Sequence, residues 1–142
     1  MKTIIISLTL SIVSFIANAQ ANIKTTKGNT ITVTVPVNTD EGKVGLALYE
    51  EHNFMKDDPF RGARAEIKNG KSIITFENIP DGEYAITIYH DKNNNNQMDF
   101  SLNKMPLENY GASNNVMSFG PPMWSDAKFA VNGEDVAMEI RL

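Results

Sequence analysis

Cysteine is absent from this chain of 142 residues. This absence excludes a disulfide scaffold, a thiol nucleophile, a thiolate zinc site and a lipid-modified cysteine. A secreted domain without disulfides depends on its hydrophobic core, and a chain of this length can bury roughly two thirds of its unfolded surface. The missing cysteines are therefore compatible with export to a bacterial periplasm or to the cell exterior.

Residues that commonly carry catalysis are also scarce. His52 and His90 are the two histidines, and neither belongs to a Gly-x-Ser-x-Gly, His-Glu-x-x-His or phosphate-loop motif. His90 and Asp91 are neighbours on an expected strand and point to opposite faces, so they do not form a base and its orienting partner. The sequence therefore predicts that the protein is not an enzyme. The alternative is a carboxylate pair drawn from Asp57, Asp58, Glu108 and Asp126.

Positive charge is in deficit, with 13 Lys and Arg against 17 Asp and Glu and a net charge of −4. Nucleic acids and anionic membranes attract proteins with the opposite balance. The composition therefore argues against both as partners.

Long hydrophobic runs are missing except for one at the start of the chain. Lys2 precedes an apolar run over 4–16, and Ala17-Asn-Ala19 forms a small-x-small cleavage site before Gln20. The run is too short for a comfortable membrane span and no second run follows it. We expect a signal peptide over 1–19, a single mature domain over 20–142 without an integral membrane segment, and a periplasmic or secreted location.

Apolar residues alternate with polar ones in short segments, and no helical period of any length appears. Turn signals recur about every ten residues, which is typical of an antiparallel β-sandwich of about seven strands. Asn132-Gly133 predicts a turn that joins the last two strands into a hairpin. The expected strands are 30–37, 44–49, 63–67, 72–76, 84–90, 127–131 and 136–142. The expected core residues are Val33, Leu46, Phe76, Ile86, Ile88 and Ile140.

The strand at 84–90 runs into a loop made almost wholly of oxygen-bearing side chains. Acidic or amide residues occupy every second position, namely Asp91, Asn93, Asn95, Gln97 and Asp99. Calcium loops place their oxygen ligands with this spacing, at positions 1, 3, 5, 7 and 9 of a twelve-residue loop. The spacing predicts a calcium site on a β scaffold; the alternative is an Asn-rich turn with purely conformational causes.

Two positions of this loop differ from the twelve-residue loop of the EF-hand, in which the calcium ligands lie between two helices. Position 6, normally glycine, is Asn96, the non-glycine residue that best tolerates a left-handed conformation. Position 12, normally a bidentate glutamate, is Leu102, so a carboxylate must come from elsewhere. We expect Glu108 to supply it, ahead of Asp126 and Asp57, and Gln97 to contribute its backbone carbonyl.

Residues 101–126 show no periodic pattern, and irregular segments of this length are usually functional. Tyr110 and Trp124 lie within it, where they either form an aromatic platform for a ligand or fill the hydrophobic core beneath the segment. The alternative function is therefore binding of a small molecule or carbohydrate by this segment. The partner would be an envelope protein or a glycan.

Four motifs follow one another in order along the chain. They are Gly82-Glu-Tyr84, His90-Asp91-x-Asn93-x-Asn95 continuing to Asp99, Tyr110-Gly111-x-Ser113-Asn114, and Phe119-Gly-Pro-Pro122-x-x-x-Asp126-Ala-x-Phe129. Together they resemble the exported bacterial proteins of the domain-of-unknown-function family 2141. Family members usually carry glycine where Asn96 stands. The resemblance implies a small exported β-sandwich of prealbumin-like or carboxypeptidase-regulatory-like type and no established activity. The fold class we expect is an antiparallel sandwich of prealbumin-like or immunoglobulin-like type.

Overall fold

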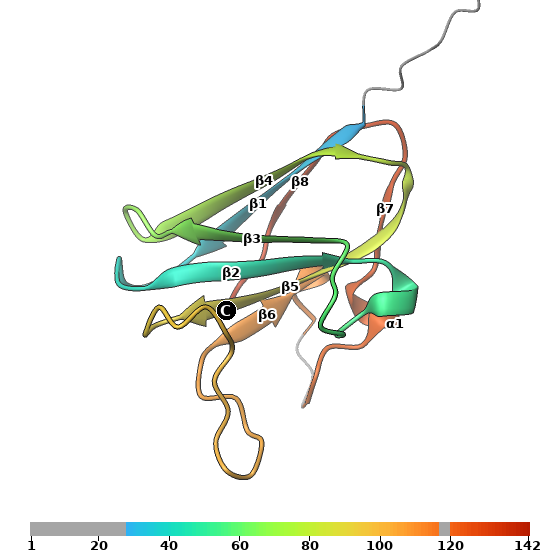
Figure 1. Cartoon of the computed structure of the whole chain (residues 1–142). Coiled ribbons are helices and arrows are strands. Elements are labelled where there is room, and N and C mark those ends of the chain that lie inside the picture. Colours follow the sequence, from blue (N-terminus) through green and yellow to red (C-terminus); the bar gives the residue numbers. More distant parts are fainter. Residues whose placement is uncertain (1–27, 117–119) are drawn as a thin grey trace, which may run out of the picture.

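The computed structural model describes residues 28–116 and 120–142, which fold into two β-sheets packed face to face (Figure 1). The expected signal peptide, residues 1–19, lies outside the described residues. A three-stranded sheet has the order β4-β1-β8 and a larger sheet the order β3-β2-β5-β6, with β7 also pairing with β5. The strands are β1 (Asn29–Pro36), β2 (Lys43–Tyr49), β3 (Arg61–Glu66), β4 (Lys71–Ile79), β5 (Gly82–Asp91), β6 (Tyr110–Ala112), β7 (Phe129–Val131) and β8 (Val136–Glu139). The predicted all-β sandwich is confirmed.

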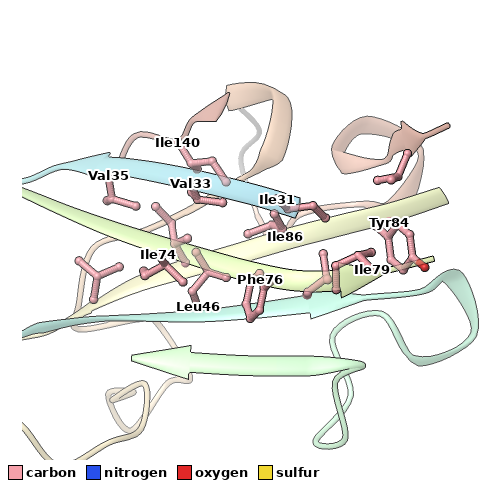
Figure 2. Close-up of a cluster of buried hydrophobic side chains, with 14 of the residues drawn as sticks. Ile31, Val33, Val35, Leu46, Ile74, Phe76, Ile79, Tyr84, Ile86 and Ile140 are labelled. Atoms are coloured by element: carbon pink, nitrogen blue, oxygen red, sulfur yellow. The ribbon is translucent and has the colours of Figure 1, made fainter. Parts of the chain in front are cut away.

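The hydrophobic core lies between the sheets, where alternate residues of each strand point inward (Figure 2). On β5, Tyr84, Ile86 and Ile88 are at most 2% exposed, and on β1 Ile31, Val33 and Val35 are fully buried. A strand alternates its side chains between two faces, so this period places one apolar face against the other sheet. All six predicted core residues are buried.

The chain crosses between the sheets more often than the sequence suggests. Asn69-Gly70 forms a tight turn, with φ of 53° and 73°, but the strands on its two sides lie in different sheets, β3 in the larger one and β4 in the smaller one. The predicted final hairpin is wrong: across Asn132-Gly133, β7 pairs with β5 while β8 pairs with β1. The β1–β8 pairing is parallel, and the other strand pairings are antiparallel.

One end of the sandwich is closed by Asp81, in the turn that joins β4 to β5. Its Oδ1 accepts hydrogen bonds from Asn29 Nδ2 at 2.8 Å and from the Gly133 N–H at 2.7 Å. Asp81 thus joins the start of β1, the β4–β5 turn and the β7–β8 connection. The opposite end of β5 is free to carry the loop that begins at Asp91.

Helices are short in the described residues: the 3₁₀ turns η1 (Glu51–Asn53) and η2 (Ser113–Asn115), and one α-helical turn, α1 (Trp124–Ala127). No described helix is long and apolar enough to cross a membrane.

Candidate functional site

Asp91, the last residue of β5, is fully buried and supports the loop that follows it. Its Oδ1 accepts the Asn95 N–H at 3.1 Å and its Oδ2 accepts the Asn96 N–H at 2.9 Å. A carboxylate that accepts two backbone N–H groups fixes the path of the chain above it, because such charge-assisted bonds are strong. Asp91 therefore shapes the whole Asp91–Asp99 loop.

Alternate side chains of this loop point toward one another, with the amide nitrogens of Asn93 and Asn95 facing the Asp99 carboxylate. Asn93 Nδ2 donates to Asp99 Oδ2 at 2.6 Å and Asn95 Nδ2 donates to Asp99 Oδ1 at 2.8 Å. The amide oxygens of Asn93 and Asn95 accept the backbone N–H groups of Asn95 and Gln97. The two amides and the Asp99 carboxylate thus form one polar cluster within the loop.

Asn96 has the left-handed conformation, with φ of 65°. Calcium loops place glycine at this sixth position because the chain turns sharply there. Asparagine is the ordinary substitute for glycine at positive φ. The backbone therefore turns sharply at Asn96, the position at which calcium loops also turn.

Glu108 lies against the base of the loop, although it is far along the chain from Asp91. It is 6% exposed, and its two carboxylate oxygens accept the N–H groups of Lys92, at 2.8 Å, and Asp99, at 3.3 Å. Glu108 is thus the carboxylate, among those considered from the sequence, that contacts both ends of the loop. Asp57 lies instead in the wall of a groove described below, and Asp126 lies in α1.

Carboxylates alone do not make a metal site here. Among residues 28–116 and 120–142, no group of three or more histidine, aspartate or glutamate side chains is positioned to hold a metal ion. A cation at the Asp91–Asp99 loop would need amide or backbone oxygens as well. Gln97 is expected to contribute its backbone carbonyl. Its N–H donates a hydrogen bond to Asn95 Oδ1 at 3.0 Å.

Ser113 and Asn114, which belong to the third sequence motif, connect neighbouring elements through hydrogen bonds. The buried Ser113 hydroxyl accepts the Ile86 N–H at 3.0 Å and donates to the Ala127 carbonyl. Asn114 Nδ2 donates to the carbonyls of Asp126 and Lys128 at 2.8 and 2.9 Å. These residues join β5, η2 and α1, so this part of the motif has a structural role.

A groove of about 890 Å³ lies on the outer face of the larger sheet. We call it the outer groove. Its floor is a row of small side chains across three neighbouring strands, since Gly62 on β3 is paired with Ala47 on β2, which is paired with Thr87 on β5. The sequence analysis missed this floor because it depends on the register between strands that are not adjacent in sequence.

The rows on either side of this floor carry aromatic rings. Tyr49 borders it on one side, while Tyr89 and Tyr110, which are paired with each other across β5 and β6, border it on the other. The Tyr89 ring lies across Gly45, where an added Cβ would be 2.2 Å from a ring carbon. Burial raises the pKa of the Tyr49 hydroxyl, with a further increase from the Asp57 carboxylate, so this phenol is neutral at physiological pH.

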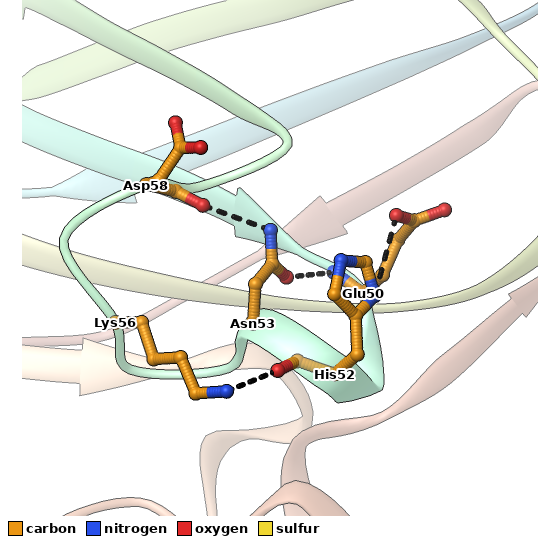
Figure 3. A network of polar contacts seen from close by, with 5 residues as sticks. All are labelled: Glu50, His52, Asn53, Lys56 and Asp58. Atoms are coloured by element: carbon orange, nitrogen blue, oxygen red, sulfur yellow. Dashed lines mark hydrogen bonds and ion pairs between the residues drawn. The ribbon is translucent and has the colours of Figure 1, made fainter.

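One wall of the outer groove comes from the connection between β2 and β3, which is held by its own polar network (Figure 3). Asn53 Oδ1 accepts the Glu50 N–H at 2.9 Å, and Asn53 Nδ2 donates to the Asp58 carbonyl at 2.9 Å. Lys56 Nζ donates to the His52 carbonyl at 2.6 Å. This network orders the segment from which Met55, Lys56, Asp57 and Pro59 line the groove.

The other walls come partly from residues 101–126, for which the sequence predicts a ligand-binding role, and partly from the residues just before them. Lys104, Met105, Pro121 and Pro122 belong to that segment, and Met98 and Phe100 precede it. Tyr110 lines the groove and its hydroxyl bonds the Gly120 carbonyl at 3.3 Å. Trp124 instead packs edge-on against Phe54 at 5.6 Å and is not part of the lining, so Tyr110 and Trp124 do not form one platform.

The two histidines differ in their surroundings: His90 is buried and His52 is exposed. His90 is 3% exposed and its Nε2 is 2.8 Å from the Glu41 carbonyl oxygen. His52 lies in η1, with Nδ1 3.7 Å from a Glu50 carboxylate oxygen. The two rings therefore belong to different parts of the fold.

The comparisons agree with the motifs. The searches of curated proteins and of solved structures found no match. A family model described as an uncharacterised protein conserved in bacteria matches residues 31–139, which include most of both sheets, the Asp91–Asp99 loop and the outer groove. The chain therefore belongs to this bacterial family, the domain of unknown function 2141.

Proposed function

We propose that this protein is an exported, non-catalytic β-sandwich module of the bacterial cell envelope whose Asp91–Asp99 loop binds one structural calcium ion. The observation that carries the calcium proposal is the convergence of Asn93 and Asn95 on the Asp99 carboxylate. Turn chemistry alone asks for polar side chains but not for their convergence on one carboxylate.

The ligands we propose are side-chain oxygens of Asp91, Asn93, Asn95 and Asp99, the backbone carbonyl of Gln97, and the Glu108 carboxylate. Ion binding requires the amides of Asn93 and Asn95 to turn over, because their nitrogens now face Asp99. The turn gives up the bonds that the two amide oxygens accept from the N–H groups of Asn95 and Gln97, and the ion would replace them with oxygen contacts, which are the contacts calcium takes. Asp91 keeps its hydrogen bonds to the chain while a carboxylate oxygen also contacts the ion.

The role of such an ion is structural. The Glu108 carboxylate already holds the N–H groups of Lys92 and Asp99, so an ion bound between Glu108 and the loop would fix the segment after β5 against the end of that strand. Few carboxylates are present, and we expect a dissociation constant of about 10⁻⁴–10⁻³ M, as in extracellular calcium modules.

Calcium is expected to raise the melting temperature of the wild-type protein, because a ligand that binds only the folded state stabilises it. At ten times the dissociation constant the gain is about 1.4 kcal/mol, which corresponds to a rise of about 5 °C. Thermal melting is followed in chelator and in about 5 mM calcium, a concentration above the expected dissociation constant.

The matched variants are Asp99→Asn, which removes one charge from the loop, and Asp58→Asn, which removes the same charge from an exposed residue outside it. Asp99→Asn is expected to abolish the calcium response and Asp58→Asn to keep it. A wild-type melting temperature that is equal in chelator and in calcium would refute the proposed ion.

Export is tested separately. The charged start, the apolar run and the Ala17-Asn-Ala19 site support cleavage after Ala19. N-terminal sequencing of the protein from the envelope or culture medium of a bacterial host is expected to begin at Gln20. Recovery of a chain that retains Met1 in those fractions would contradict the export proposal and leave the calcium proposal unaffected.

A further inference from the structure

We propose that the outer groove binds a small amphipathic anion, a molecule with an apolar body and one acidic group. The proposal is independent of calcium binding. Protein sites for small molecules are concave and mostly apolar, with volumes of about 300–1,000 Å³ and a few polar groups that fix orientation. The outer groove, at about 890 Å³, lies within this range.

The apolar body fits the floor and walls of the groove. The floor of Gly62, Ala47 and Thr87 lacks large side chains, so a chain or ring can lie directly on the sheet between the tyrosines. Three methionines line the walls, Met55, Met98 and Met105. Methionine is flexible and polarisable, so it packs against irregular apolar surfaces.

Several of these wall residues are exposed to solvent. Phe100 is 58% exposed, Met105 61% and Met55 49%. Exposed apolar side chains that are grouped at one groove mark a binding site for a ligand or a partner. An apolar ligand body would remove these surfaces from water, at about 25 cal/mol for each Å² of apolar area buried.

The acidic group follows from the charges around the groove. Its lining contains the cationic side chains of Lys56, Arg64 and Lys104 and one carboxylate, Asp57. The whole chain has the opposite balance, with more acidic than basic residues. The groove is therefore a local positive site on an acidic protein, and electrostatic complementarity of this kind selects for an anion.

Arg64 is the residue best placed to meet the acidic group. It lies on the outer face of β3 beside Gly45, and its Nη2 donates to the Asn96 carbonyl at 2.7 Å. That bond holds the guanidinium at the edge of the groove and occupies one of its five N–H donors. The remaining donors match the geometry of a carboxylate or phosphate.

The test is calorimetric titration of the full mature chain, in chelator, with decanoate, decanol and decyltrimethylammonium below their aggregation concentrations. These probes share one apolar body and differ in charge. Decanoate is expected to bind at least ten times more tightly than decyltrimethylammonium, with decanol between them. Binding of none of the three up to millimolar concentration, or equal binding of the anion and the cation, would overturn the proposal.

Gly62→Val tests the floor. A Cβ added at Gly62 meets open space, with Pro59 Cγ 4.0 Å away as its nearest neighbour, and valine suits a strand. The variant is expected to fold and to bind decanoate at least ten times more weakly. Ala137→Val, at an exposed position of β8 in the other sheet, is the matched control and is expected to bind like the wild type. Unchanged binding by a folded Gly62→Val protein would overturn the proposal.

Arg64→Gln tests the charge without touching the floor. Decanoate binding is expected to weaken about two- to fivefold, the effect of losing one exposed ion pair, while decanol binding stays the same. Equal effects on both probes would contradict a role for this charge.

A soluble neutral oligosaccharide serves as a further probe, and its binding in place of decanoate would assign the groove to carbohydrate and overturn the anion proposal.

Discussion

Replacing Ile86 by alanine is expected to destabilise the protein by about 3 kcal/mol and to lower its melting temperature by about 10 °C. Ile86 is fully buried on β5, at the centre of the larger sheet, and it packs between the two layers of the sandwich (Figure 2). Its removal loses buried methyl groups and leaves a cavity that the surrounding strands fill only in part.

Ile73→Ala is the matched control, because Ile73 lies on β4 with 53% of its surface exposed. The same change there is expected to cost less than about 1 kcal/mol. Chemical denaturation measures both free energies of unfolding. Equal losses at the two positions would mean that the layer between the sheets is not the centre of stability.

The alternating pattern predicts this core because burial on one face of a strand is a local property. Val33 and Ile88 could be assigned from two-residue periodicity alone, since each strand presents its apolar side to the same layer. Pairing is different, because it depends on contacts between distant segments. Val131 at the end of β7 and Ile140 just after β8 are both fully buried, yet β7 and β8 belong to different sheets.

The turn at Asn132-Gly133 shows why that connection was mistaken for a hairpin. Gly133 has a φ of 72°, as the turn signal predicts, and its N–H is held by Asp81 rather than by a partner strand. A local turn motif defines how the chain bends but not which sheet it enters next. The parallel pairing of β8 with β1 follows from that crossover and leaves no local signal.

The loop was predicted in more detail than the groove, and for a physical reason. The spacing of Asn93, Asn95 and Asp99 acts within one short segment, so their convergence follows from the loop itself. Glu108 was predicted as a calcium ligand, because a loop without a residue for position 12 needs a carboxylate from elsewhere, and the structure places its carboxylate against the N–H groups of Lys92 and Asp99. The groove depends instead on the pairing of Gly62 with Ala47, which only the sheet register defines.

Replacing Asp91 by alanine is expected to destabilise the protein by about 2–4 kcal/mol even in chelator. The carboxylate is fully buried and accepts the N–H groups of Asn95 and Asn96. Hydrogen bonds to charged groups contribute about 1.5–3 kcal/mol each. Removing the carboxylate also relieves the cost of burying a charge, but it leaves the two N–H groups without this acceptor, which makes the net change unfavourable.

Denaturant unfolding in chelator isolates this structural contribution from any effect of calcium. Asp58→Ala, at an exposed aspartate, is the control and is expected to change the free energy of unfolding by less than about 0.5 kcal/mol. In calcium, the wild type is expected to gain stability while Asp91→Ala gains none, so the difference between them grows by about 1.4 kcal/mol at ten times the dissociation constant. A loss below about 1 kcal/mol in chelator would mean that Asp91 does not organise the loop through these hydrogen bonds. A normal calcium response in the variant would remove Asp91 from the proposed ligands.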